Sequence, residues 1–166
     1  MTFDRFLANP EKIRPLYADF PALRGVRVRS INLNWRGPNV ALRLDLPIFP
    51  EHPPQEWADA GVDTVQCQLR FLAAGTISLS DWSPPATADI ETVPCGEPGT
   101  IRVTATGDGI TLSFTCSDSV LIGHLSAYRS RSDGTDAGRH LFLSRIDARR
   151  YTSLPGTDEK TFYERF

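Results

Sequence analysis

The sequence predicts a mostly β fold, either an antiparallel β sandwich or a strongly curved sheet of about nine strands. The first observation is that apolar and polar residues alternate at every second position in segment after segment, as in strands that bury one face. The second is that Gly, Pro, Asn and Asp separate these segments at short intervals. A chain of 166 residues can bury a sizeable core, so we expect one domain over residues 1–166.

The N-terminal segment Phe3–Tyr17 is predicted to be a short helical region. Pro10 is acceptable in the first turn of a helix, and Asn9 before it is a candidate N-cap. Pro15 argues against a long helix, because proline removes a backbone donor and clashes with the preceding turn.

The first two strands are predicted at Val26–Trp35 and Val40–Leu46. The alternation changes phase near Ser30, which predicts a β-bulge at that point. The turn Arg36–Asn39, with the sequence Arg-Gly-Pro-Asn, separates the two strands by a short connection. Together these features predict an antiparallel hairpin.

The rest of the chain repeats this alternation. Thr106–Gly109, with the sequence Thr-Gly-Asp-Gly, is its strongest hairpin turn, and Arg129–Arg139 is interpreted as a polar loop. Further strands are predicted at Asp63–Leu72, Thr76–Leu79, Asp89–Val93, Thr100–Ala105, Ile110–Cys116, Ser119–Tyr128 and His140–Ile146.

The C-terminal part is predicted to be an extension of the β-rich core. Residues 1–130 form the core, and residues 131–166 add one strand and a possible short helix. Thr157 is the candidate cap of that helix, in which Phe162 and Phe166 share a face.

The stretch Phe49–Trp57 reads FPEHPPQEW and lies between two predicted strands. Proline fixes φ and removes a donor, so we predict a stiff connector with no helix or strand interior through Pro53 and Pro54. His52 is predicted to be neither a base nor a ligand. Trp57 is predicted to close the loop against the sheet with a mostly buried ring, whereas a solvated ring would mark a binding residue.

Trp35 and Trp82 also lie beside predicted turns. We interpret them as aromatic caps at the ends of the core. The alternative is an exposed aromatic platform for sugar rings or for a protein partner.

The net charge of −2 is unevenly distributed along the sequence. Residues 1–44 hold eight basic and three acidic residues, a balance of +5. Residues 45–99 hold nine acidic residues and one arginine, a balance of −8, and residues 100–166 sum to +1. The middle third is therefore expected to build a negative face, unless the fold mixes the segments and dilutes the asymmetry.

Sequence motifs for catalysis or metal binding are missing. There is no G-x-S-x-G elbow, P-loop, H-E-x-x-H or dinucleotide glycine pattern. His124 lies in an apolar strand and is interpreted as a buried core imidazole. The cysteines are odd in number and lack metal-ligand spacing: Cys67, Cys95 and Cys116. We therefore predict no enzyme activity, no cofactor and no metal.

The N-terminus Met1–Pro10 carries charged residues and no apolar run, unlike a signal peptide. No segment approaches the roughly 20 apolar residues of a membrane span. The expected location is the cytoplasm, with reduced thiols and without a disulfide between Cys67 and Cys116.

Several segments together resemble the immunity protein 50 family of bacterial polymorphic toxin systems. They read ANPEKIRPLY, VRVRSINLNWRGPNVALRLDLP, FPEHPPQEWADAGVDTVQCQLRF, TISLSDW and LSAYR, and the resemblance covers roughly Met1–Arg129. The P-P-x-x-W step before the alternating VQCQLRF strand is its most specific part. The resemblance implies a protein that neutralises a cognate toxin domain in the producing cell, and it supplies no catalytic residues.

The function expected from these observations is steric blockade of a cognate toxin domain, with no nucleic-acid or membrane partner. The alternative functions are a sugar- or small-ligand-binding β sandwich that uses Trp57, and a small hydrolase on a jelly-roll-like scaffold. Toxins that attack nucleic acids need basic clefts, so an acidic surface would favour their capture. The predicted toxin contacts are Glu51, Glu56, Asp59 and Asp81.

Overall fold

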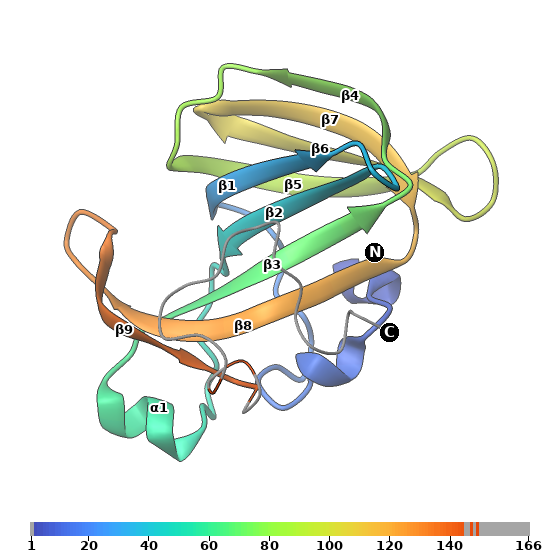
Figure 1. Ribbon diagram of the computed structural model, residues 1–166. Helices are drawn as coiled ribbons and strands as arrows, with labels where there is room; N and C mark the ends of the chain where they lie inside the picture. Colours follow the sequence, from blue (N-terminus) through green and yellow to red (C-terminus); the bar gives the residue numbers. More distant parts are fainter. Residues whose placement is uncertain (1, 145–146, 148, 150–166) are drawn as a thin grey trace.

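The computed structural model describes residues 2–144, 147 and 149. Over these residues it has nine strands in one open antiparallel sheet, in the order β4-β7-β6-β5-β1-β2-β3-β8-β9 (Figure 1). The predicted mostly β, antiparallel fold is confirmed. The strands are β1 (Val26–Asn34), β2 (Asn39–Asp45), β3 (Thr64–Leu72), β4 (Gly75–Ser80), β5 (Ala86–Pro94), β6 (Thr100–Asp108), β7 (Ile110–Ser117), β8 (Val120–Ser130) and β9 (Asp136–Phe142).

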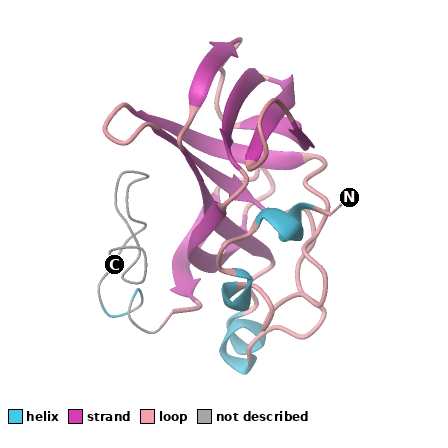
Figure 2. Cartoon of the chain, turned by 90° about the vertical axis from the view of Figure 1, so that its right-hand side faces the viewer, coloured by secondary structure: helices cyan, strands magenta, loops and turns pink. Residues whose placement is uncertain are grey.

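The sheet changes direction where β1 meets β5. These two strands pair only over Val26–Val28 and Ala86–Ala88, so the group β4 to β7 stands at an angle to the group β1, β2, β3 and β8 (Figures 1 and 2). Phe71 of β3 contacts Phe114 of β7 edge to face, with ring centroids 5.1 Å apart. The apolar core therefore lies between two halves of the same sheet.

The hairpin of β1 and β2 has the predicted bulge. Val28 pairs with Leu44 and Ser30 pairs with Arg43, so the register shifts by one residue between them. Arg29 is the extra residue, and its side chain reaches Asp45 on the outer face of the sheet. The bulge thus directs the charged side chain of Arg29 toward the buried carboxylate of Asp45, since an extra residue in a strand changes the direction of its side chain.

The N-terminal region is less helical than predicted. It contains two short 3-10 helices, η1 (Phe3–Phe6) and η2 (Pro10–Lys12), because Pro10 and Pro15 leave no room for a continuous helix. Asn9 makes no cap hydrogen bond. Its side chain instead donates to the carbonyl of Ile122 at 2.8 Å and accepts from the N–H of Ile122 at 2.9 Å. This pairing holds the N-terminal segment against β8.

The proline loop ends in a helix that was not predicted, α1 (Gln55–Ala60). Pro54 is its N-cap, and Gly61 ends it in the left-handed conformation. The prediction of a buried Trp57 is confirmed, since its exposed fraction is 2% and its ring lies 6.5 Å from that of Phe49. His52 is exposed in the loop before the helix. Six residues give too weak a periodic signal for a helix prediction.

Strand β9 begins earlier than predicted. The interpretation of Arg129–Arg139 as a loop is wrong, because β8 extends to Ser130 and β9 starts at Asp136. The real turn lies between them, and Arg131 bonds to Thr135 across it. The alternation pattern did not indicate this pairing, because both strands carry polar side chains here. The predicted helix after Thr157 lies outside the described residues.

Candidate functional site

The four predicted acidic contacts do not gather on one surface. Glu51, Glu56 and Asp59 are exposed on α1 or in the loop before it. Arg129 of β8 donates hydrogen bonds of 3.2 and 3.3 Å to carbonyls at the end of α1, so this helix lies toward the β9 edge of the sheet. Asp81 is exposed after β4, the strand at the opposite edge. We call the group Glu51, Glu56 and Asp59 the acidic α1 surface.

A buried polar cluster lies on the outer face of β1, β2, β3 and β8. Its centre is Asp45, whose exposed fraction is 6%. Asp45 Oδ2 accepts two hydrogen bonds from Arg29, at 2.7 and 2.9 Å, and one from the Tyr128 hydroxyl at 2.6 Å. Asp45 Oδ1 accepts a fourth from Gln66 Nε2 at 3.0 Å. No sequence pattern indicates this cluster, because its members come from four strands and share no local motif.

The cluster also fixes the turn before β9. Arg29 Nη2 donates to the carbonyl of Gly134 at 2.8 Å and lies 3.4 Å from Asp136 Oδ1. Burial alone would lower the pKa of Arg29, but the hydrogen bond and charge of Asp45 raise it on balance. Burial, followed by the hydrogen bond to Asp45, raises the pKa of Tyr128. Arg29 therefore stays charged and Tyr128 stays protonated, and the cluster acts as a structural clamp.

Ser126, His140 and Asp136 form a row that resembles a nucleophile, a base and an orienting acid. His140 Nδ1 lies 2.9 Å from Ser126 Oγ, and His140 Nε2 lies 2.5 Å from Asp136 Oδ2. Ser126, however, is 0% exposed, and the His140 ring stacks on Tyr128 with centroids 4.7 Å apart. A substrate carbonyl cannot reach a hydroxyl without exposed surface. The row therefore ties β9 to β8 and offers no accessible nucleophile.

Two of the thiols and the remaining histidine are also structural. Cys67, Cys95 and Cys116 are free, as predicted. Burial raises the pKa of Cys67, and it raises that of Cys116 to about 12, so both thiols stay protonated and unreactive. The prediction of a buried His124 is confirmed; its Nδ1 lies 3.7 Å from Asp147 Oδ2, and both side chains are 1% exposed.

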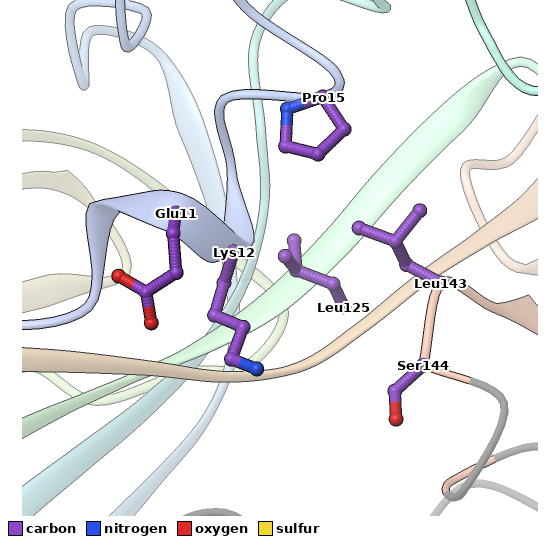
Figure 3. A pocket seen from close by; sticks show the side chains of 6 residues that line it. All are labelled: Glu11, Lys12, Pro15, Leu125, Leu143 and Ser144. Atoms are coloured by element: carbon purple, nitrogen blue, oxygen red, sulfur yellow. The ribbon is translucent and has the colours of Figure 1, made fainter.

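The hollow shown in Figure 3 is shallow and small. Its volume is about 220 Å³, below the roughly 300 Å³ at which ligand pockets usually begin, whereas four other open hollows measure between about 320 and 380 Å³. Leu125 and Leu143 form its apolar part, and Glu11, Lys12 and Ser144 carry its polar groups. No group of metal-ligating side chains gathers in the described part of the chain. Within the same residues, no helix has the length and hydrophobicity that a membrane crossing requires.

The position of Trp35 corrects the sequence interpretation. Its side chain does not cap the core, because 80% of it is exposed in the turn between β1 and β2. Trp82, in contrast, is partly buried against the core as predicted. Trp35 continues the apolar phase of Ile31 and Leu33, and that phase runs past the end of the core. The sequence feature that could have indicated an exposed ring is the position of this tryptophan at the turn of a hairpin. Trp35 is exposed because the end of the hairpin extends beyond the residues that cover the core.

A model of the immunity protein 50 family matches residues 9–124 of the chain. The chain belongs to the immunity protein 50 family. The match runs from the segment before η2 into β8, so it contains β1 to β7, α1 and the Trp35 turn. No curated protein and no solved structure matches the chain. The resemblance to this family in the sequence is thereby confirmed.

Membership of the immunity protein 50 family implies an immunity protein with a protein partner, a toxin. It also suggests a non-catalytic role. The geometry agrees with that role, because the one Ser–His–Asp row among the described residues is buried. What an immunity protein of this fold can offer a partner is its exposed surface, and two features of that surface stand out: the acidic α1 surface and the Trp35 turn.

Proposed function

We propose that this immunity protein binds a cognate secreted toxin domain in the cytoplasm of the producing cell and neutralises it by steric blockade. The family match carries the proposal. The burial of Ser126 supports blockade over chemical inactivation, because the hydroxyl of the Ser–His–Asp row has no access to solvent.

We propose the acidic α1 surface as a toxin contact. Glu51, Glu56 and Asp59 are exposed within nine residues of sequence, and the rigid proline loop and the buried Trp57 hold them in place. Toxins that cleave nucleic acids carry basic clefts, since they bind phosphates. An opposite field on the immunity protein speeds encounter with such a cleft. Asp81 contributes a contact only to a partner that also reaches the β4 edge.

The experiment tests whether this protein neutralises the toxin by forming a complex of defined stoichiometry with it. The toxin domain is sought in the gene next to the one that encodes this protein, it is expressed with and without the protein, and survival of the host is scored. The purified proteins are then combined, and the complex is measured by size-exclusion chromatography with light scattering and by calorimetry. We expect survival and a stable complex in which the toxin is recovered chemically intact by mass spectrometry. A modified toxin, or protection without a complex, would contradict steric blockade.

A further inference from the structure

The turn between β1 and β2 presents an aromatic and a cationic side chain together. Trp35 is 80% exposed, the highest value among the large apolar residues in the described part of the chain, and Leu33 near it is 49% exposed. The guanidinium carbon of Arg36 lies 5.2 Å from the centroid of the Trp35 ring. An exposed indole contributes nothing to folding, because its apolar surface stays in water.

The backbone of this turn is held in place. Asn34 Oδ1 accepts a hydrogen bond of 2.9 Å from the N–H of Arg36, which is the local bond of an Asx turn. Gly37 takes a φ of 63°. The carbonyl of Pro38 accepts a bond of 2.9 Å from the N–H of Ala74, which ties the turn to the connection between β3 and β4. A fixed turn lowers the entropy cost of ordering Trp35 in a complex.

The charge around the turn restricts its partner. Arg36 is exposed, and it is the one charged residue of the segment 30–38. Tryptophan and arginine are the side chains that most often dominate the energy of a protein interface, where they fill desolvated pockets. The complementary surface is therefore an apolar recess with a carboxylate at its edge.

We propose that Trp35 and Arg36 anchor the toxin domain, with the indole in an apolar recess and the guanidinium against an acidic group at its rim. This anchor rests on the proposed function. It is separate from the acidic α1 surface, since the turn precedes β2 and the proline loop follows it. The six residue steps of β2 put roughly 20 Å between the end of the turn and the start of the connection that leads to the proline loop.

The experiment measures binding of the neighbouring toxin domain to Trp35→Ala, Trp35→Phe and Arg36→Ala. Matched controls are Val93→Ala, whose side chain is 52% exposed on β5, and Arg24→Ala, another exposed arginine. We expect Trp35→Ala to weaken binding at least about 30-fold, Arg36→Ala by about fivefold or more, and Trp35→Phe by less than Trp35→Ala. The controls stay within about threefold. All variants keep the wild-type unfolding temperature, because none of these side chains is buried.

A second readout uses the fluorescence of the same residue. Trp57 is 2% exposed and Trp82 is partly buried, so acrylamide quenches mainly Trp35 in the free protein. We expect the toxin to protect this emission from quenching. If the toxin binds but Trp35→Ala binds equally well and quenching is unchanged, the anchor is wrong while the proposed function stands. If the wild-type protein does not bind the toxin, both are wrong. Binding to a glycan array that depends on Trp35 would replace the protein anchor by a sugar platform.

Discussion

Tyr128 donates its hydroxyl hydrogen to Asp45 Oδ2 at 2.6 Å, and this bond reaches from β8 over β3 to β2. Asp45 is buried, so each bond that it loses costs more than a bond at the surface. We expect Tyr128→Phe to lower the free energy of unfolding by about 1–3 kcal/mol. Asp45→Ala removes the nearer of the two carboxylates beside Arg29 and leaves Asp136 at 3.4 Å, and we expect it to cost about 3–5 kcal/mol. Urea unfolding followed by tryptophan fluorescence measures both values.

The matched control for the clamp is Asp59→Ala, which removes an exposed carboxylate from α1. Its effect on the free energy of unfolding stays within about 0.5 kcal/mol. Equal stabilities for Asp45→Ala and Asp59→Ala would show that the buried cluster contributes no net stability.

The second prediction concerns Trp57 and its neighbour His52. Trp57→Ala removes a buried ring that packs near Phe49, and we expect a loss of about 3 kcal/mol or more in the free energy of unfolding. His52 is exposed, so His52→Ala leaves stability and toxin binding nearly unchanged. Trp35→Ala serves as the size-matched control, because the same truncation at an exposed site leaves no cavity. A small effect of Trp57→Ala would mean that α1 is not needed for the fold.

The third prediction concerns the two halves of the sheet. Leu44 and Leu69 are 0% exposed in one half, and Phe114 is 1% exposed in the other. Substitution of any of them by Asp buries an uncompensated carboxylate, so each variant is expected to unfold. Circular dichroism and proton NMR dispersion report the outcome. A folded Phe114→Asp variant would show that the β4 to β7 half does not share the core with β3.

The fourth prediction is a pH dependence that comes from Asp63. Partial burial alone would raise its pKa, but bonds from the Ser130 N–H and from the hydroxyls of Thr64 and Ser130, with the charge of Arg129, lower it below 3.8. A carboxylate whose pKa is lower in the folded than in the unfolded state stabilises the fold, and this stabilisation is fully present when the pH lies above the pKa of the unfolded state. The stabilisation is lost as the pH falls through the pKa of the folded state.

We therefore expect Asp63→Asn to be less stable than the wild type at pH 6 and the difference to shrink steadily below about pH 4. Urea midpoints between pH 3 and 6 measure it. Asp108→Asn is a control, an exposed aspartate elsewhere on the sheet. A difference that stays constant with pH would mean that the hydrogen bonds, rather than the charge of Asp63, carry the stability.

The fold could be predicted from the sequence where one face of a strand packs against the apolar core. The alternation in β2, β3 and β7 follows directly from the burial of Leu44, Leu69 and Phe114, and the phase change at Ser30 marked the bulge. The alternation pattern places the start of β9 too late because its first residues include Asp136, Gly138 and Arg139, so the strand begins without the apolar residues that the pattern expects. Helix α1 was too short for a periodic signal.

The candidate sites were harder to predict, because they depend on which segments meet. Charge along the sequence located Glu56 and Asp59 on an exposed surface, but it could not show that Asp81 lies at the other edge of the sheet. Trp35 was assigned to the core because aromatic residues beside turns usually cap it. Only the arrangement of the hairpin shows that nothing among the described residues covers this ring.

The last prediction tests the acidic α1 surface by reversing its charge. Glu56 and Asp59 are exposed, so the double variant Glu56→Lys, Asp59→Lys keeps the fold and changes the local field. If the toxin presents a basic cleft, this variant associates more slowly than the wild type, and the defect shrinks as salt rises because ions screen exposed charges. Stopped-flow association at several salt concentrations measures the rates.

The matched control reverses the same number of charges elsewhere: Glu91→Lys, Glu97→Lys, two exposed glutamates of β5 and the loop after it. Both double variants change the net charge equally, so a purely global effect slows both by the same factor. A defect confined to the α1 pair locates the toxin contact there, and a further defect in Asp81→Lys would extend it to the β4 edge. If the association rate depends neither on salt nor on the charge reversals in α1, the acidic α1 surface is ordinary solvated surface. The Trp35 turn is then the contact to test.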